Sequence, residues 1–327
     1  MTPSKTKKTI ASYFIAGIDI GGTSTVIGLV DNNNNIVQRK AIHTATYEYA
    51  ETFLEEICDT ITNFDQLSDI SLLKGIGIGA PNGNYYKGTI EFAPNLRWKG
   101  IIPVVDIIRQ KLPGMPVILT NDANAAAIGE MMYGDAKGKK DFIMITLGTG
   151  VGSGIVVNGE LVYGHDGFAG EIGHTIYIPN GRQCGCGRKG CLETYTSASG
   201  IVKTAIELLN KKSDDSELRN IPVDELTTLH VGNAANRGDQ IAIDTFDKTA
   251  EILAIKLADS AAHTSPSTIY IFGGVANAGK VLMEPLKKYF EENLLEVFKN
   301  KIQIKPSALH QNDTAILGAA ALIKKAL

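Results

Sequence analysis

Short apolar runs that end in glycine-rich turns recur along this chain. Residues 13–20 form an apolar, strand-like run that meets a turn at Gly21 and returns as a second strand over 26–30. Residues 142–147 form a similar run, which enters the turn LGTGVGSG at Gly148, 127 residues after the first turn, and returns as a strand. A strand, glycine turn and strand that occur twice predict a duplicated architecture with a ligand cleft between its halves.

Helical and further strand patterns alternate with these units. Residues 53–61 have helical periodicity, and Cys58 falls on the apolar stripe, so we interpret it as a core residue. Residues 268–272 predict a buried strand, followed by GGVANAGK and a helix that contains Pro285. The alanine-rich segment 314–326 predicts a C-terminal helix. This alternation of strands and helices is typical of the α/β class.

Length, composition and charge exclude several classes of protein. The 327 residues suffice for about two domains, each with its own core, and 44% hydrophobic with 20% charged residues argues against disorder. The net charge of −3 provides no positive field that would attract nucleic acid. We find no apolar stretch suited to a membrane span and no signal-peptide core. We therefore expect a cytoplasmic protein without nucleic-acid or membrane partners.

The glycine turns are the first candidates for chemistry. Glycines at a strand end expose backbone amides that can hold phosphate oxygens, although the first turn alone could be a simple hairpin. Two such turns could clamp a triphosphate, and Asp19, in IDIGGTST, could hold Mg2+ beside it, directly or through water. The candidate residues for binding such a ligand are Asp19, Gly21, Gly22, Thr23, Thr149, Gly150, Gly152, Gly273 and Gly274.

Two better-known nucleotide motifs fit the sequence less well. The run GIGIGA at 75–80 has dinucleotide-fold spacing, but Pro81 and Asn82 follow where a helix should begin. The segment 274–280 has the spacing of a P-loop, but Val281 stands where a hydroxyl must bind Mg2+. We reject the first motif and disfavour the second, although Gly273 and Gly274 could let a flat ring or a ribose approach the backbone.

Three of the four cysteines lie close together in the segment EIGHTIYIPNGRQCGCGRKGC. With His174, the thiols of Cys184, Cys186 and Cys191 suit a closed tetrahedral zinc site, and the intervening glycines allow tight turns. A closed site leaves no position for a catalytic water, so we expect one structural zinc ion per chain. The alternative is that the thiols are unligated surface groups, which would be prone to oxidation.

Polar residues follow the apolar strand 116–119, at Asn121 and Asp122. Strand ends are where open α/β sheets place their ligands, although an Asp in this position is more often a helix cap. Glu171, His174 and Glu193 lie among glycines elsewhere in the chain, as recognition of a hydroxyl-rich ligand requires. We see no linker, and the best candidate for a domain boundary is 122–124.

These motifs together resemble those of the ROK family of sugar kinases, and within it the bacterial glucokinases. IDIGGT is similar to the first phosphate loop of the family and TLGTGVGSG to the second. FAPNLRW and TNDANAAA resemble its sugar-binding and catalytic segments, and EIGH with CGCGRKGCLE resembles its zinc and sugar signature. The resemblance implies an actin-like, ribonuclease-H-like fold. We expect a small α/β lobe at 1–122, a large lobe at 123–311 with the zinc loop at 174–191, and a helix at 312–327 that packs back on the first lobe.

The resemblance also implies a reaction and a set of site residues. The reaction is ATP-dependent phosphorylation of the glucose 6-hydroxyl, with Asp122 as the general base and Mg2+ bound with ATP. His174 would bind both zinc and sugar, and the assembly would be a homodimer or homotetramer. The implied sugar-binding residues are Asn95, Asn121, Asp122, Glu171, His174 and Glu193.

Departures from the family pattern leave alternatives open. Ser24 replaces a lysine that is common after the first glycine turn, and Asn82 replaces a common glycine, although Asn tolerates positive φ. A kinase for N-acetylmannosamine, N-acetylglucosamine, fructose or allose would share every motif. A non-catalytic, sugar-sensing repressor is the remaining alternative, but about a dozen residues before the first strand leave no room for its DNA-binding helices.

Overall fold

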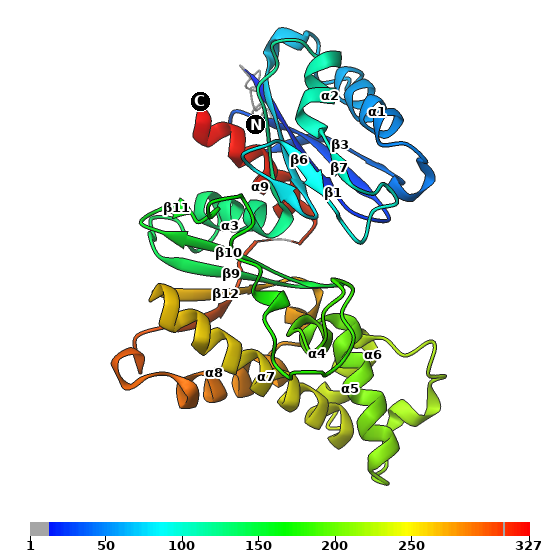
Figure 1. Ribbon diagram of the computed structural model, residues 1–327, viewed down its shortest axis with the longest axis vertical. Coiled ribbons are helices and arrows are strands. Elements are labelled where there is room, and N and C mark those ends of the chain that lie inside the picture. Colours follow the sequence, from blue (N-terminus) through cyan, green and yellow to red (C-terminus); the bar gives the residue numbers. More distant parts are fainter. Residues whose placement is uncertain (1–12, 310) are drawn as a thin grey trace, which may run out of the picture. The chain divides into compact units, whose positions relative to one another are not determined.

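The computed structural model describes residues 13–309 and 311–327, and it divides into two compact units. The first unit runs to Ala125 and also contains Asn312–Leu327, and the second unit is Ala126–Gln311. Figure 1 shows that each unit combines a β-sheet with helices. In the part of the chain that the structure describes, no helix is both long enough and apolar enough to cross a membrane.

The first unit is built on a five-stranded sheet with the order β3-β2-β1-β4-β8. The first three strands in this order pair antiparallel, whereas β4 and β8 continue the sheet parallel to β1. Parallel pairing places the ends of β1, β4 and β8 at one edge, where Asp19 is opposite Gly79 and Gly79 is opposite Thr120. The strands are β1 Phe14–Ile20, β2 Thr25–Asp31, β3 Ile36–Ile42, β4 Leu73–Ala80 and β8 Val117–Asn121.

Alternating side chains of β1 enter two separate hydrophobic clusters. Ile18 belongs to the cluster that contains α1 (Ala50–Thr62) and α2 (Val104–Lys111), whereas Ile15 belongs to the cluster that contains α9 (Gln311–Ala326). Cys58 of α1 is buried in the first cluster, so its predicted core position is confirmed. A smaller sheet is formed by β5 Gly83–Asn84, β6 Thr89–Glu91 and β7 Ile101–Ile102, and the short helices are η1 Thr44–Thr46 and η2 Ile70–Leu72.

The helix α9 lies directly on the backbone of this sheet. A Cβ atom on Gly17 would lie 2.1 Å from the carbonyl oxygen of Ile316, and one on Gly77 would lie 1.8 Å from that of Ala319. No side chain fits in either place, so these glycines allow the close packing of helix on sheet.

The second unit repeats the strand order of the first, as β11-β10-β9-β12-β13. The strands β11, β10 and β9 pair antiparallel, and β12 and β13 continue parallel to β9. The predicted duplication of the strand, turn and strand unit is therefore confirmed at the level of the whole sheet. The strands are β9 Phe142–Leu147, β10 Val151–Val157, β11 Glu160–Leu161, β12 Thr268–Phe272 and β13 Gln303–Pro306.

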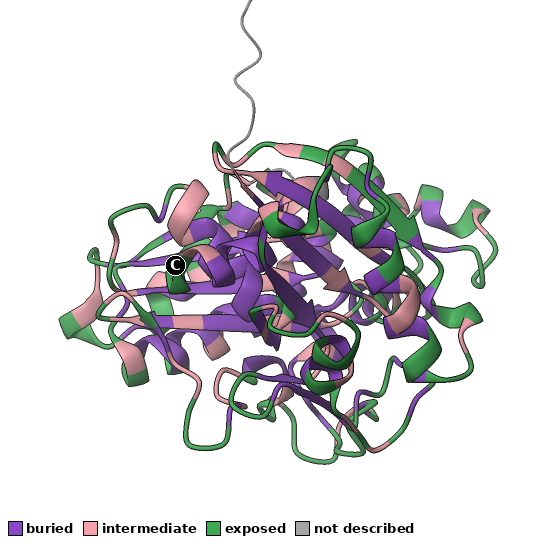
Figure 2. Ribbon diagram, turned by 90° about the horizontal axis from the view of Figure 1, so that it is seen from above, coloured by how far each residue is buried: buried purple, intermediate pink, exposed green. Residues whose placement is uncertain are grey.

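Helices supply most of the second core. The inward side chains Ile143, Ile145 and Leu147 of β9 pack in one cluster with Leu253 and Leu257 of α7. Figure 2 shows that the strands are mostly buried and that exposed residues concentrate in loops and on outer helix faces. The helices are α3 Asp122–Tyr133, which begins in the first unit, α4 Glu193–Thr196, α5 Ala198–Lys211, α6 Thr228–Asn236, α7 Gln240–Thr264 and α8 Lys280–Asn293, with η3 Ile172–His174, η4 Glu217–Asn220, η5 Gly274–Ala278 and η6 Glu296–Phe298.

The second glycine turn is shorter than its sequence suggested. The returning strand begins at Val151, so only residues 148–150 form the turn. Gly152, expected in the phosphate-binding turn, lies inside β10 opposite Thr146 of β9. The antiparallel hydrogen bonds of the two strands extend this far because glycine residues do not prevent strand pairing.

Candidate functional site

The first glycine turn joins β1 to β2 and packs against the segment that contains Asn95. The Gly21 amide donates a hydrogen bond to the Ser24 carbonyl oxygen over 3.1 Å, which closes the turn. A Cβ atom on Gly22 would lie 2.4 Å from the Asn95 carbonyl oxygen. Thr23, Ser24 and Asn95 are exposed, so the turn and the predicted sugar residue form one accessible surface in the first unit.

Two carboxylates lie at the strand ends beside this turn. Asp19 is the sixth residue of β1, and Asp122 is the first residue of α3, directly after β8. Between them, a Cβ atom on Gly79 would lie 3.9 Å from Asp19 Oδ1 and 3.5 Å from the Asp122 Cα atom. Gly79 therefore lies close to both acidic residues, and the charge of Asp122 acts on Asp19.

The surroundings raise the pKa of both acids. Burial, and then the charge of Asp122, raises the pKa of Asp19 to about 7. Desolvation also raises the pKa of Asp122, against the opposing effect of the hydrogen bond from the Ala123 amide. The Asp122 residue as a whole is nevertheless exposed.

Asn121 and Asp122 also cap the start of α3. The Ala123 amide donates to Asn121 Oδ1 and to Asp122 Oδ1, each over 2.8 Å. The capping interpretation is thus correct in its geometry. It is compatible with a chemical role, because the cap fixes both side chains at the end of β8.

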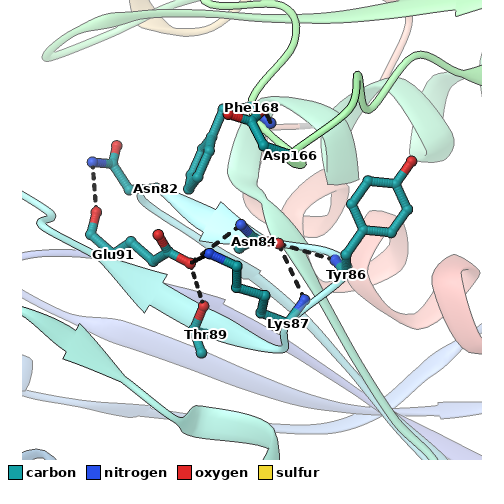
Figure 3. A network of polar contacts seen from close by, with 8 residues as sticks. All are labelled: Asn82, Asn84, Tyr86, Lys87, Thr89, Glu91, Asp166 and Phe168. Carbon is teal, nitrogen blue, oxygen red and sulfur yellow. Dashed lines mark hydrogen bonds and ion pairs between the residues drawn. The ribbon is translucent and has the colours of Figure 1, made fainter.

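A buried network orders the hairpin that precedes Asn95 (Figure 3). Glu91 Oε1 accepts hydrogen bonds from Asn84 Nδ2 and Lys87 Nζ, each over 3.2 Å, and from Thr89 Oγ1 over 2.9 Å. Asn84 Oδ1 in turn accepts from two backbone amides of the β5–β6 turn. Glu91 is only 8% exposed, so this carboxylate serves the hairpin rather than solvent.

Asn82 has the positive φ that was expected at the position where the family commonly has glycine. Its φ is 50°, and its Nδ2 donates to the Glu91 carbonyl oxygen over 2.9 Å. The amide of Glu91 donates back to the Asn82 carbonyl oxygen over 3.2 Å. The side chain of Asn82 therefore joins the hairpin in a way that glycine could not.

The predicted metal ligands come together in the second unit. One ligand atom from each of His174, Cys184, Cys186 and Cys191 lies within 4.8 Å of all the others. The separations of Cys184 Sγ from His174 Nδ1 and of Cys186 Sγ from Cys191 Sγ are both 3.7 Å. Tetrahedral zinc with zinc–sulfur bonds of about 2.3 Å requires sulfur atoms roughly 3.7 Å apart. The donor set and its spacing therefore fit a zinc site.

Residues 171–193, which we call the cysteine loop, are held by tight turns and by Arg182. A Cβ atom on Gly190 would lie 1.7 Å from the Ile178 carbonyl oxygen, and the φ of Gly190 is 79°, so this position requires glycine. The Arg182 guanidinium donates to the carbonyl oxygens of Thr194 and Gly200 over 2.8 and 3.0 Å. These bonds attach the loop to α4 and α5.

Glu193 connects the cysteine loop to the second glycine turn. Its Oε2 accepts a hydrogen bond from the Val151 amide over 3.0 Å, and its Oε1 lies 3.6 Å from Cys184 Sγ. Sequence patterns indicated Glu193 as a sugar ligand but gave no sign of this bond. The other two predicted sugar residues of the loop differ in exposure: Glu171 is exposed, and His174 is partly buried.

A cavity of about 480 Å³ lies beside the second glycine turn. Thr149 and Gly274 border it, as do Leu229 and Asn233 of α6 and Phe246 of α7. Gly273 has a φ of 104°, and a Cβ atom there would lie 2.3 Å from the Leu147 carbonyl oxygen, so glycine is required. The sequence gave no sign that α6 borders a cavity. Its capping box at Thr227 indicates only where the helix begins.

The predicted site residues thus form two sets, one in each unit. The first unit holds Asp19, Gly21, Gly22, Thr23, Asn95, Asn121 and Asp122. The second holds Thr149, Gly150, Gly152, Glu171, His174, Cys184, Cys186, Cys191, Glu193, Gly273 and Gly274.

Comparisons with known proteins match nearly the whole chain. The ROK family pattern matches residues 15–326. A glucokinase from Halalkalibacterium halodurans is 36% identical over 323 residues, which cover 97% of this chain and 96% of that protein. An N-acetylmannosamine kinase from Shigella boydii is 28% identical over 321 residues, which cover 93% of this chain and 96% of that protein.

A solved structure shows the same fold. The crystal structure of a ROK family glucokinase from Streptomyces griseus, in complex with glucose and AMPPNP, matches with a TM-score of 0.81 at 34% identity. The match covers 95% of this chain and 99% of that one. The expected actin-like α/β fold is therefore confirmed. The chain belongs to the ROK family.

Proposed function

We propose that this protein is an ATP-dependent hexose kinase whose substrate is glucose, phosphorylated at the 6-hydroxyl. The observation that carries the proposal is the pair of carboxylates at the strand ends, Asp19 and Asp122, beside a glycine turn that packs on Asn95. Sugar kinases require an acceptor for the hydroxyl proton and a site for the phosphate groups. The first unit offers residues of both kinds within one edge of its sheet.

Asp122 is the general base in this proposal. Its carboxylate accepts the proton of the sugar 6-hydroxyl as that oxygen attacks the γ-phosphorus of ATP, and the bond from phosphorus to the ADP oxygen breaks. A raised pKa makes Asp122 a stronger base than an ordinary carboxylate, and the residue as a whole is exposed. Asn95 and Asn121 are the further sugar ligands that we propose in the first unit, and the family resemblance implies Glu171, His174 and Glu193 as sugar ligands as well.

The second unit would hold the nucleotide. We propose that the cavity of about 480 Å³ receives the adenine base and ribose, with the side chains of Leu229 and Phe246 as apolar surfaces. The amides of Thr149 and Gly150 would hold phosphate oxygens, whereas the Gly148 amide donates to the Gly150 carbonyl oxygen over 3.0 Å and closes the turn. Asp19 would hold Mg2+, directly or through water, and the metal would supply charge neutralisation at the β- and γ-phosphates.

Zinc would be structural, with His174, Cys184, Cys186 and Cys191 as its four ligands. Native mass spectrometry should show one zinc ion per chain, and a protein that carries none in non-chelating buffer would contradict this ligand set. The family resemblance further implies a homodimer or homotetramer, which light scattering coupled to size-exclusion chromatography measures.

The test of the function is ADP release from Mg-ATP with glucose, mannose, fructose, N-acetylglucosamine, N-acetylmannosamine and allose. The highest kcat/KM should be for glucose. The similarity to an N-acetylmannosamine kinase is the reason for including the acetamido sugars. If one of them has the highest kcat/KM, the proposed substrate is wrong, but the proposed roles of Asp122 and zinc remain. If zinc-loaded, folded protein releases no ADP with any of these sugars, the kinase proposal is wrong.

A further inference from the structure

Both arms of the cysteine loop contact Val151, the residue that follows the second glycine turn. On one arm, Glu193 Oε2 accepts a hydrogen bond from the Val151 amide over 3.0 Å, two residues after the predicted ligand Cys191. On the other arm, a Cβ atom on Gly173 would lie 2.0 Å from the Val151 carbonyl oxygen, one residue before the predicted ligand His174. The Val151 amide is thus bonded to a neighbour of a metal ligand, and its carbonyl oxygen lies directly against another.

Side-chain packing reinforces these backbone contacts. Val151 is 5% exposed and belongs to the same hydrophobic cluster as Ile172 and Leu192, which are 7% and 0% exposed. The turn itself is also in contact, because a Cβ atom on Gly150 would lie 2.6 Å from Glu193 Oε2. The Glu193 carboxylate therefore lies between the cysteine cluster and the turn.

We propose that the metal cluster braces the second glycine turn, with Glu193 as the positioning residue that connects them through the Val151 amide. A metal ion bound by His174 on one arm and by the cysteines on the other cross-links the two arms of the loop. The cross-link keeps Glu193 and Gly173 in the places where they fix Val151. Removal of the metal would therefore loosen the turn as well as the loop.

The loop has a second anchor that does not involve the metal. Arg182 donates to Thr194, Gly200 and Thr204, and its guanidinium pairs with Glu207 over 2.9 Å. This anchor lies against α4 and α5. Among the described residues, the hydrogen-bond partners of Arg182 do not include Val151. It should keep the loop attached to the second unit when the metal ligands are released, so loosening of the turn can be measured in folded protein.

Hydrogen exchange of the Val151 amide reports this brace directly, without reference to activity. In the zinc-loaded full-length protein, Glu193→Gln and Glu193→Ala should speed exchange at Val151 about tenfold or more, since a charge-assisted hydrogen bond is weakened or lost. Zinc content should stay at one per chain in Glu193→Gln. Removing the metal from the unmodified protein should speed the same amide, while amides of β12 stay protected.

Glu207→Gln is the matched control, because it removes a carboxylate from the other anchor of the same loop. It should leave Val151 exchange unchanged. If Val151 exchange is insensitive both to Glu193→Gln and to metal removal, the brace does not exist. If Glu207→Gln has the same effect as Glu193→Gln, general loosening of the loop and not the Glu193 bond is responsible, and the positioning role is wrong.

A second measurement tests whether this link between the metal cluster and the turn affects nucleotide binding, and it rests on the proposed function of the turn. The Kd for ADP, measured by calorimetry, should rise about tenfold in Glu193→Gln and on metal removal, but not in Glu207→Gln. A brace seen by exchange in a protein that binds no ADP would overturn the proposed function and leave the brace established. Normal ADP affinity in both perturbed forms, together with faster exchange, would overturn the brace's role in nucleotide binding.

Discussion

The two glycine turns occupy equivalent places in sheets of the same strand order, yet they are built from different chemistry. Each follows the central strand, and in each a glycine meets a neighbour at close range: Gly22 meets the Asn95 carbonyl oxygen and Gly150 meets the Glu193 carboxylate. The penultimate strand residue is Asp19 before the first turn and Thr146 before the second. The same scaffold therefore places a titratable acid at one turn and a neutral hydroxyl at the other.

The difference extends to what holds each neighbour in place. The segment before Asn95 is ordered by hydrogen bonds to the buried Glu91 carboxylate, whereas Glu193 follows a cluster of metal ligands. Repetition of a fold unit thus fixes where a turn lies, and the segments packed against it decide what it can do. The first turn therefore has acidic groups at the neighbouring strand ends, whereas the carboxylate beside the second turn comes from Glu193 of the cysteine loop.

Asp122→Asn should have the largest effect, because it removes the proposed general base, which lies at the end of β8 beside the first turn. Turnover should fall by about 10²-fold or more, while sugar binding largely survives, since asparagine can still accept the Ala123 amide bond. Steady-state kinetics give the loss in kcat, and calorimetry gives the sugar Kd. Near-normal kcat would remove Asp122 from the role of base.

Alanine at the two close-packed glycines tests how rigid each neighbour is. In Gly22→Ala the new methyl group would lie 2.4 Å from a backbone oxygen, whereas in Gly150→Ala it would lie 2.6 Å from the end of a side chain. A backbone segment cannot rotate away, so Gly22→Ala should destabilise by about 2 kcal/mol and Gly150→Ala by roughly half as much. Scanning calorimetry of both variants measures which one is destabilised more. A larger loss of stability in Gly150→Ala would mean that the Glu193 side chain is held more rigidly than the backbone at Asn95.

The sequence predicted the repeated sheet well because its signals were local. Apolar runs such as 142–147 and 268–272 match β9 and β12 at both ends, and the cysteine spacing identified a cluster that the structure brings together. Contacts between distant segments had no such signal. The bond from Val151 to Glu193 spans 42 residues, and α6 borders the large cavity without any binding motif.

The effect most diagnostic of the difference between the turns is the pH dependence of Asp19→Asn. Burial and the charge of Asp122 raise the pKa of Asp19 to about 7 in the folded protein, against an ordinary value of 3.8. Between these values the folded state holds a proton that the unfolded state has released, so stability is lost as pH rises from about 4 through 7.

Asparagine cannot ionise. Without metal or nucleotide, Asp19→Asn should therefore match the unmodified protein near pH 4 and be more stable at pH 8, by at most about 4 kcal/mol. Thr146→Val at the equivalent position of the second turn is the control, and its effect on stability should not vary with pH because threonine does not titrate in this range. Unfolding by urea at several pH values measures both, and a constant difference for Asp19→Asn would mean that the acid at the first turn is not held in its neutral form by the fold.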